Sequence, residues 1–393
     1  MNYILFDGPA RNALLPFTFT RPVAEIRVGI LTIREKWEKH LGFTTSTVTE
    51  NYLSDKFPMV EFEDNIMINA SYLPTPKLVT QIKDLQPGQA IFNKDIPVAF
   101  YTKEGTAVDF EFYKIIQSET APEHTIKHTW DIFTNNPGEI EADFDLLTKD
   151  KNSQELSSDN IIIGEHQVFI EDGAKVKVSI LNTTEGPIYI GKNAEVMEGS
   201  MIRGPFALCG HATVKMGAKI YSGTTIGPYA KVGGEVSNSV IFGYSNKGHD
   251  GFLGNSVIGE WCNLGADTNT SNLKNNYASV RLWNYETGNF AKTGLQFCGL
   301  MMGDHSKCGI NTMFNTGTVV GVSANIFGGG FPRNFIPSYS WGGSGGFTTY
   351  LTKKAFEVAN VVMKRRNLEF TKQEEAILEQ VFEQTQSWRK GYE

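Results

Sequence analysis

Three observations predict a chain made of a small α/β domain, a parallel β-solenoid of the β-helix type and a C-terminal helical segment. Short apolar runs alternate with helical patterns in the first quarter of the chain. Branched aliphatic residues then recur at every sixth position through the centre. Two helical patterns close the sequence, and the total of 393 residues is long enough for two or three domains.

The six-residue repeat is the strongest pattern in the sequence. A helix would give apolar spacings of three and four and a flat strand a spacing of two, so a spacing of six indicates a hexapeptide β-helix. No single turn of such a coil can bury its own apolar face, so the turns must stack. We expect eight aliphatic side chains to point into the coil: Ile190, Val196, Ile202, Leu208, Val214, Ile220, Ile226 and Val232.

The repeat is interrupted twice. After Val232 the spacing shifts by two residues, and we expect it to resume at Val240 and to continue through Asn246, Phe252, Ile258 and Leu264. After a longer gap it continues at Met302, Cys308, Phe314, Val320 and Ile326. Insertions in a solenoid form loops on one face, often the binding face. Segments 234–251 and 271–301 are therefore where we predict the chemistry, and a purely structural solenoid is the alternative.

The chain divides into four predicted parts. Residues 1–110 form the α/β domain, with strands at 3–6, 66–69 and 97–101 and helices at 29–39 and 76–84. Polar residues 111–160 form a helical connector, and 161–346 form the β-helix with a Gly/Pro-rich exit. Residues 347–393 form two helices split near Asn367, the second capped by Thr371 and Glu374. These helices should pack on the solenoid and cover an exposed edge.

Composition excludes several classes of protein. A net charge of -7 provides no basic footprint for nucleic acid. The four cysteines have no CxxC spacing, so neither a disulfide framework nor a metal site is expected, and a reducing cytoplasm fits. The N-terminus does not read as a signal peptide, and no apolar run reaches membrane-spanning length. We therefore expect a cytoplasmic protein without nucleic-acid or membrane partners.

Two motifs carry a family resemblance. KGHDGFLG (247–254) and GADTNTSNLKNN (265–276), together with the repeat, resemble the acetyltransferase half of the bifunctional glucosamine-1-phosphate N-acetyltransferase / N-acetylglucosamine-1-phosphate uridyltransferase family. The stretch from 278 to 314 is closer to archaeal sugar-phosphate thymidylyltransferase relatives. The opening segment resembles a shortened bacterial form of these enzymes. The resemblance implies a left-handed coil, which periodicity alone does not fix, and a homotrimer.

The resemblance implies a catalytic role for His249 and Asn272. His249 would be the general base that takes a proton from the sugar 2-amino group, a task for which an imidazole is suited near neutral pH. Asn272 matches a family asparagine that could orient the amine or the thioester carbonyl through its amide. The alternative for Asn272 is a corner asparagine in the left-handed backbone region.

Five further residues are implied to contact the amino-sugar 1-phosphate. Lys274 and Arg281 supply positive charge for the phosphate, and an arginine can bind it with two parallel hydrogen bonds. Glu235 matches a family carboxylate near the sugar, with a solvated surface glutamate as the alternative. Lys247 belongs to the histidine motif, and Phe252 stands where many relatives carry an aromatic hydroxyl.

The resemblance also implies acetyl-CoA as cofactor, in the groove between neighbouring β-helices of a trimer. Backbone groups of Ile310 and Thr312 would hold the pantetheine arm. Lys307 and Arg333 would meet its phosphates, and Arg333, in the exit loop, is the best candidate.

The α/β domain departs from the nucleotidyltransferase pattern. The family carries a Gly-rich loop after its first strand, where this chain has FDGPARN with one glycine. The Lys that usually follows a Pro is missing after Arg21-Pro22. Asp7, Arg11 and Arg21 are the candidates for contacting UTP or dTTP, and Mg²⁺ is needed only if this domain is active. The alternative is a degenerate domain that binds nothing or only regulates.

Three functions compete. The first is transfer of acetyl from acetyl-CoA to an amino-sugar 1-phosphate, coupled to synthesis of a UDP-N-acetylglucosamine-type sugar nucleotide. The second is a sugar-1-phosphate uridylyl- or thymidylyltransferase whose β-helix serves trimerisation and regulation. The third is a non-enzymatic scaffold. His249, Asn272 and the basic loop favour the first, and loss of the Gly-rich loop disfavours the second.

Overall fold

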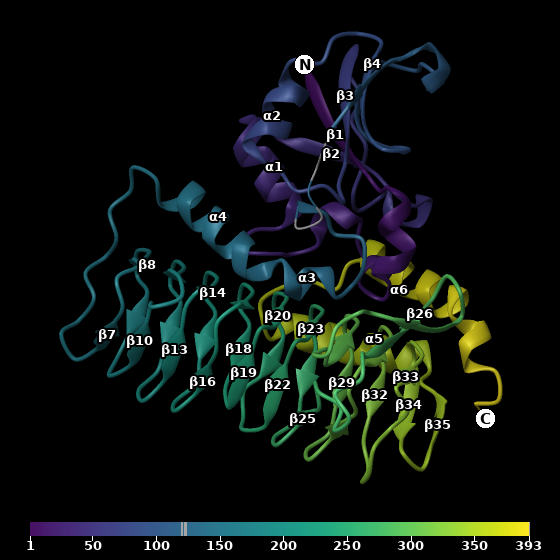
Figure 1. Cartoon of the computed structure of the whole chain (residues 1–393). Coiled ribbons are helices and arrows are strands. Elements are labelled where there is room, and N and C mark those ends of the chain that lie inside the picture. The colour runs from purple at the N-terminus through teal and green to yellow at the C-terminus, as the bar shows by residue number, and fades with distance from the viewer. Residues whose placement is uncertain (119–120, 122–123, 393) are drawn as a thin grey trace.

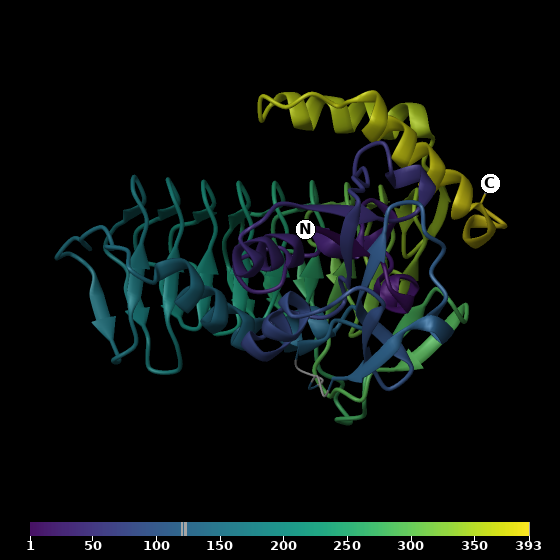
Figure 2. The same cartoon turned by 90° about the horizontal axis from the view of Figure 1, so that it is seen from above.

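The computed structural model describes all residues except 119–120, 122–123 and 393, so parts of the predicted connector and the last residue lie outside the description. An α/β domain sits on one long face of a β-helix, and two C-terminal helices run beside it (Figures 1 and 2). The predicted fold class, a small α/β domain followed by a left-handed parallel β-helix and C-terminal helices, is confirmed.

The α/β domain contains a six-stranded sheet in the order β2-β1-β3-β5-β4-β6. The first three strands in that order are parallel, and β5 runs antiparallel to β3. The predicted strands correspond to β1, β3 and β5 and the predicted helices to α1 and α2, whereas β2, β4 and β6 were not predicted. The elements are β1 (Asn2–Phe6), α1 (Ile33–Leu41), β2 (Thr45–Val48), β3 (Asp64–Asn69), α2 (Pro76–Lys83), β4 (Gln89–Asn93), β5 (Ile96–Lys103) and β6 (Lys114–Gln117).

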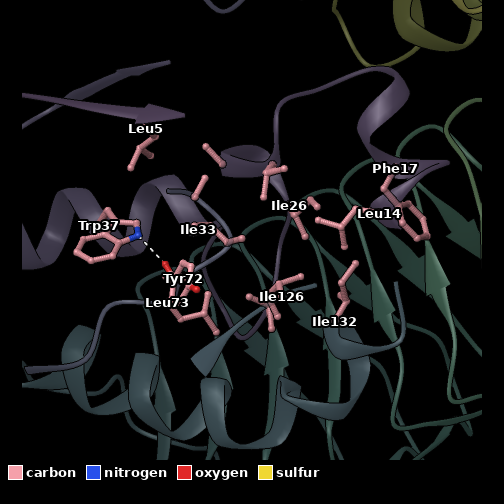
Figure 3. Packing of buried hydrophobic residues seen from close by; sticks show 14 of the residues in the cluster. Leu5, Leu14, Phe17, Ile26, Ile33, Trp37, Tyr72, Leu73, Ile126 and Ile132 are labelled. Atoms are coloured by element: carbon pink, nitrogen blue, oxygen red, sulfur yellow. Dashed lines mark hydrogen bonds between the residues drawn. The ribbon is translucent and has the colours of Figure 1, made fainter. Parts of the chain in front are cut away.

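The core of this domain continues into the β-helix. Aliphatic side chains such as Leu5, Ile26 and Ile33 pack together, and the Trp37 indole donates a hydrogen bond to the Tyr72 carbonyl at 3.0 Å (Figure 3). The same apolar cluster includes Val240, Phe242, Val257, Met301 and Val319 from the β-helix. The Phe17 and Phe242 rings lie 5.6 Å apart across the boundary. The two parts therefore share one core.

The β-helix has three flat sides, which we call face 1, face 2 and face 3. Their main sheets have six, nine and ten strands respectively. Face 1 contains β7 (Ile161–Ile163), β10 (Ile180–Asn182), β13 (Met201–Arg203), β16 (Lys219–Ile220), β19 (Glu235–Ser237) and β22 (Phe252–Gly254). Face 2 contains β8 (Val168–Ile170), β11 (Ile188–Ile190), β14 (Phe206–Leu208), β17 (Thr224–Ile226), β20 (Val240–Ile241), β23 (Val257–Ile258), β28 (Leu300–Met302), β31 (Thr318–Val320) and β33 (Phe335–Ile336). Face 3 contains β9 (Lys175–Val176), β12 (Glu195–Val196), β15 (Thr213–Val214), β18 (Lys231–Val232), β21 (Asn246–Lys247), β24 (Asn263–Leu264), β29 (Lys307–Cys308), β32 (Asn325–Ile326), β34 (Ser340–Gly343) and β35 (Gly346–Thr349).

The predicted repeat is confirmed over its regular part. All eight aliphatic side chains from Ile190 to Val232 are buried in the interior of the coil. Ile190 is paired with Leu208 and Leu208 with Ile226, so each coil takes three hexads. The later positions Met302, Cys308, Phe314, Val320 and Ile326 are buried in the same interior.

The predicted register across the first interruption is wrong by one residue. Ile226 is paired with Ile241 and Val232 with Lys247, so the inward positions are Ile241, Lys247 and Leu253, not Val240, Asn246 and Phe252. The coil after Val232 is shorter than its neighbours, so the inward positions shift by one residue there. The predicted register returns at Ile258 and Leu264, which are buried in the interior of the coil. Segment 234–251 is thus a shortened coil and not an inserted loop.

The second interruption is a true insertion. After β25 (Asn269–Thr270), which pairs with β30 (Met313–Phe314), the chain leaves the coil. It forms an antiparallel hairpin of β26 (Arg281–Asn284) and β27 (Asn289–Lys292) before it returns at β28. Val280, Leu282 and Tyr285 of this excursion are buried in the core shared with the α/β domain.

Buried polar contacts fix the connector between the two parts. The connector forms α3 (Asp131–Thr134) and α4 (Asn136–Thr148). Lys36 of α1, which is 2% exposed, forms ion pairs with Asp143 at 2.6 Å and Glu139 at 2.8 Å. The Asn136 amide accepts from the Gly29 amide and donates to the Gly223 carbonyl of the coil at 2.8 Å. Because these groups are buried and paired, α4 holds the domain and the β-helix in one arrangement.

The C-terminal helices are α5 (Thr352–Lys364) and α6 (Lys372–Gln384). Their split near Asn367 and the capping box of Thr371 with Glu374 are confirmed. The Tyr339 hydroxyl donates to the Leu378 carbonyl at 2.7 Å, which attaches α6 to the last coil. Arg366, just beyond α5, donates to the Asn246 side chain on face 3. Within the described residues, no helix combines the length and apolar character that a membrane span requires.

Candidate functional site

His249 lies at the corner where face 3 passes into face 1, between β21 and β22. The side chain is exposed, and within the described part of the chain it has no side-chain hydrogen bond or ion pair. Later coils stack on this corner, because the Asp267 amide donates to the Asp250 carbonyl and the Asn311 amide donates to the Ala266 carbonyl. The corner therefore forms a continuous ridge from His249 toward Ile310.

Lys247 does not face this ridge. Its side chain points into the coil and is 2% exposed, and its ammonium donates to the carbonyls of Gly233 at 3.1 Å and His249 at 2.7 Å. Burial lowers its pKa to about 8. The expectation that Lys247 contacts the sugar phosphate is therefore wrong: the shortened coil turns this position inward, away from any ligand on the surface.

Three of the predicted residues meet on face 1. Glu235 and Phe252 are paired neighbours on β19 and β22, and both are partly exposed. The Asn272 amide donates to the Asn255 side-chain oxygen at 2.8 Å. A Cβ at Gly254 would lie 2.6 Å from both the Asn272 amide nitrogen and the Phe252 ring, so a larger residue there would displace these two side chains. Asn272 does not have a positive φ, which excludes the alternative of a left-handed corner asparagine.

The predicted basic residues Lys274 and Arg281 are spread over the insertion. Lys274 donates to the Ser279 carbonyl at 3.3 Å, within the loop that follows Asn272. Arg281 lies on the β26–β27 hairpin, and its guanidinium donates to the Phe290 carbonyl at 2.8 Å. That hairpin packs beside β31 of face 2. Lys274 thus follows Asn272 of the face 1 cluster by two residues, whereas Arg281 lies on a separate element, the β26–β27 hairpin.

The candidate acetyl-CoA residues also separate into two groups. Ile310 is 70% exposed on the same ridge as His249, and the Thr312 hydroxyl is turned inward to the Gly309 carbonyl. Arg333 is exposed in the exit loop and has no ion pair with a described residue. Lys307 instead lies on face 3, where its ammonium donates to the His305 carbonyl at 2.8 Å. Ile310 and Arg333 are therefore the candidates with accessible positions, and of the two only Ile310 is placed on the ridge.

In the loop after β1, the charged side chains of Asp7 and Arg11 bind each other and neighbouring groups of the protein. Asp7 accepts from the Val23 amide, the Thr49 hydroxyl and the Arg11 guanidinium, at 2.7, 2.6 and 2.8 Å. Burial raises the pKa of Asp7, and Arg11 opposes that rise. Arg11 also donates to the Thr18 carbonyl at 2.6 Å. Both side chains are buried, so the expectation that Asp7 and Arg11 contact a nucleotide is not met in this arrangement.

Arg21 belongs to the boundary between the domains. Its guanidinium forms a buried ion pair with Asp304 and a second one with Glu260 at 3.2 Å, both from the β-helix. Asp304 also accepts from the Thr20 hydroxyl at 2.6 Å and from the Glu260 amide at 2.8 Å. Asp304 and Glu260 hold this guanidinium at the domain boundary. The predicted contact of Arg21 with a triphosphate stays a prediction, and this ion pairing weighs against it.

Two groups in these sites were missed by sequence reasoning. Asn255 accepts the amide of Asn272, yet no spacing distinguishes it from the other corner asparagines. Asp304, 283 positions from Arg21, is the buried partner of that arginine, and nothing local in the sequence connects the two. No group of three or more His, Cys, Asp and Glu side chains within the described ranges could hold a metal ion. The ligand oxygens of Asp7 are occupied, so this loop does not fit Mg²⁺.

Comparison with known proteins gives a family match for the N-terminal part. Residues 3–152 match the family described as "Sugar nucleotidyl transferase". The chain is 29% identical over 173 residues to the bifunctional sugar-1-phosphate nucleotidylyltransferase/acetyltransferase of Sulfurisphaera tokodaii, covering 44% of this chain and 41% of that protein. It is 27% identical over 149 residues to YaiX of Escherichia coli, described as a putative uncharacterized acetyltransferase, covering 37% of this chain and 64% of YaiX. The chain thus spans less than two thirds of either relative.

A solved structure with the β-helix architecture is more distant. The Francisella novicida UDP-N-acetylglucosamine acyltransferase is 14% identical, with a TM-score of 0.26, and the match covers 58% of this chain and 90% of that one. A score of this size supports no inference about mechanism.

Proposed function

Because the chain joins a sugar nucleotidyl transferase family domain to a left-handed β-helix, we propose that it transfers acetyl from acetyl-CoA to the amine of an amino-sugar 1-phosphate. One observation carries the proposal. An exposed, uncommitted imidazole at His249 stands on the corner next to the face 1 cluster of Glu235, Phe252 and Asn272. A scaffold would not need this grouping at the place where the repeat changes.

The proposed reaction uses His249 as a general base. Bound acetyl-CoA supplies an activated thioester carbonyl. The sugar nitrogen forms a bond to the carbonyl carbon, the carbon–sulfur bond breaks, and the sulfur leaves as the thiolate. His249 takes the proton that the nitrogen loses and can return it to the leaving sulfur. The step therefore needs His249 with an unprotonated ring nitrogen directed at the sugar amine.

The neighbouring side chains would position the substrates. Asn272, fixed by Asn255, can direct its remaining amide donor and its oxygen at the reacting groups. Glu235 can accept hydrogen bonds from sugar hydroxyls, and Lys274 and Arg281 would supply charge for the phosphate. Phe252 would pack against the sugar, but it has no hydroxyl with which to donate a hydrogen bond. Acetyl-CoA would follow the ridge past the backbone of Ile310 and Thr312 toward Arg333.

A homotrimer would complete this site. Face 2 is covered by the α/β domain, and α5 lies beside face 3, which leaves face 1 as the open side. Its outer row carries the exposed apolar side chains Ile161, Ile163, Met201 and Tyr221. Closed threefold packing of a triangular prism would cover that row. Light scattering on the purified chain tests the trimer, and a monomer at working concentration would exclude a shared site.

A second function is favoured by the family match over residues 3–152. Under it, the α/β domain would join UTP or dTTP to a sugar 1-phosphate with Mg²⁺, so that the chain would make a UDP-N-acetylglucosamine-type product. The closed loop after β1 weighs against this second function. We place the protein in the cytoplasm, where its four buried free cysteines would stay reduced.

The test is the loss of acetyl transfer in His249→Ala. A positioned general base contributes about 10²–10⁴-fold, so turnover with glucosamine 1-phosphate and acetyl-CoA should fall by that factor. His166→Ala is the matched control, because His166 is an exposed histidine in the first coil, far along the chain from the site. Near-normal transfer by a correctly folded His249→Ala protein would exclude the mechanism.

A further inference from the structure

A cavity of about 470 Å³ lies between the C-terminal end of α5 and the outer surface of face 3. It is separate from the His249 ridge, since its walls are the outward side chains of β18, β21, β24 and β29. The volume lies within the range of about 300–1,000 Å³ that is usual for small-molecule sites. Its lining includes Lys307, which the family resemblance assigns to the phosphates of acetyl-CoA. The path proposed above for acetyl-CoA, along the ridge toward Arg333, does not pass through this cavity.

Four cations converge on the cavity: Lys231, Lys307, Arg365 and Arg366. No aspartate or glutamate lines it, and none of the four forms an ion pair with a carboxylate in the described ranges. Their contacts are with neutral groups. Arg366 donates to the Asn246 side chain at 3.3 Å, and Lys307 donates to the His305 carbonyl at 2.8 Å.

These four like charges repel one another when no anion lies between them. Burial lowers the pKa of Lys231, and the nearby Arg366 lowers it further. Burial also lowers the pKa of Lys307. The helix dipole accounts for Arg365 and Arg366, because cations are favoured at the C-terminal end of a helix. It does not account for two lysines that point at the same space from strands of the coil.

We propose that this cavity binds an anion that carries a diphosphate group. Guanidinium groups fit phosphate oxygens with paired hydrogen bonds, and ammonium groups add point charges. Four cations match the charge of a diphosphate better than that of one phosphate. The aromatic walls offer only their edges, because the Tyr244 and Trp261 rings stack on each other at 4.2 Å and their outer faces meet Tyr229 and His305. Charge, and not base stacking, therefore selects the ligand.

The experiment measures binding of inorganic pyrophosphate to the full chain by calorimetry, with orthophosphate and sulfate as comparison anions. Arg365→Ala/Arg366→Ala should weaken pyrophosphate binding about tenfold or more. Lys353→Ala/Lys354→Ala is the matched control, since it removes the same charge from exposed positions at the other end of α5 and should leave the affinity unchanged. Binding should also weaken with added salt.

Lys231→Gln tests the cavity from the β-helix side, so the result does not depend on α5 staying docked. It should weaken pyrophosphate as well. Competition by ADP, UDP-N-acetylglucosamine or CoA then identifies whether the natural diphosphate belongs to a nucleotide, a sugar nucleotide or the acyl carrier. The proposal is overturned if pyrophosphate does not bind, if it binds no better than sulfate, or if the control variant loses as much affinity as Arg365→Ala/Arg366→Ala.

Discussion

The loop after β1 and the His249 corner carry the same kinds of residue but differ in what those residues contact. In the loop, Asp7 and Arg11 are buried and satisfy each other, and Arg21 is bound by Asp304 of the β-helix. At the corner, His249 is exposed and Glu235 and Phe252 are partly exposed. Charged residues after a strand therefore indicate a site only when no internal partner neutralises them.

The largest effect on the contrast between these two regions is expected from Asp304→Ala. Asp304→Ala leaves Arg21 buried with Glu260 alone and removes the acceptor of the Thr20 hydroxyl. Loss of one partner of a buried pair typically costs about 3–5 kcal/mol, so the free energy of unfolding should fall by that amount. Denaturant unfolding measures it, and Asp145→Ala, an exposed aspartate on α4, is the control.

If Arg21 bound a nucleotide instead, Asp304→Ala would have a different effect on the free energy of unfolding. If Arg21 served a triphosphate, Asp304→Ala would free it and stability would hardly change. If it is an interface residue, Arg21→Met combined with Asp304→Leu should recover part of the loss, because both charges are then removed together. A double variant no more stable than Asp304→Ala would contradict the interface role.

The second prediction concerns the inward lysine of the corner motif. Because burial lowers the pKa of Lys247 to about 8, while an unfolded lysine titrates near 10.4, the unfolded chain binds more protons between these values. The free energy of unfolding should therefore rise as pH rises through that window, and the cost is fully present at neutral pH. Lys247→Met removes the titrating group, so the free energy of unfolding should lose this rise with pH.

Denaturant unfolding at pH 7 and pH 10 checks this prediction. The pH dependence in the window should be reduced in Lys247→Met and retained in Lys219→Met, a control in which the lysine lies on the exposed side of face 1. Acetyl transfer should persist in Lys247→Met, since the side chain does not reach the surface. A large increase in the KM for the sugar phosphate would show that Lys247 does contact substrate.

The smallest effect is expected at Asn255. This residue has a φ of +48°, so Asn255→Gly keeps the backbone shape while it removes the acceptor of the Asn272 amide. One such hydrogen bond is worth about 0.5–1.5 kcal/mol, so kcat for acetyl transfer should fall by about tenfold or less. Asn255→Asp keeps the oxygen and should restore kcat. Equal activity of the wild type and Asn255→Gly would remove the positioning role.

The fold was predictable because the β-helix repeat is local. The aliphatic spacing from Ile190 to Val232 follows from the coil geometry alone, and Thr371 with Glu374 marks a helix start within four residues. The register after Val232 was not predictable, because Val240 and Ile241 are both aliphatic. Only their packing, one against the α/β domain and the other inside the coil, distinguishes them.

The site was predictable in part for the same reason. His249 and Asn272 lie in continuous motifs, so their placement at one end of face 1 followed from the sequence. The roles of Arg21 and Lys247 depend on residues and faces that the fold brings together over long distances in the chain. The cavity beside α5 likewise combines strands of the coil with residues more than a hundred positions later, such as Asn246 and Arg366.

The shared core has a consequence for biosynthesis. The α/β domain leaves the ribosome first. The apolar surface of Phe17 and its neighbours stays uncovered until Val257, Met301 and Val319 have been synthesised and have folded against it. During that interval the nascent chain exposes a surface that chaperones recognise and that other chains can bind. A fragment that begins at residue 161 would expose the complementary surface of face 2 permanently. Such a fragment should therefore aggregate when it is expressed alone, even though every one of its coils is intact.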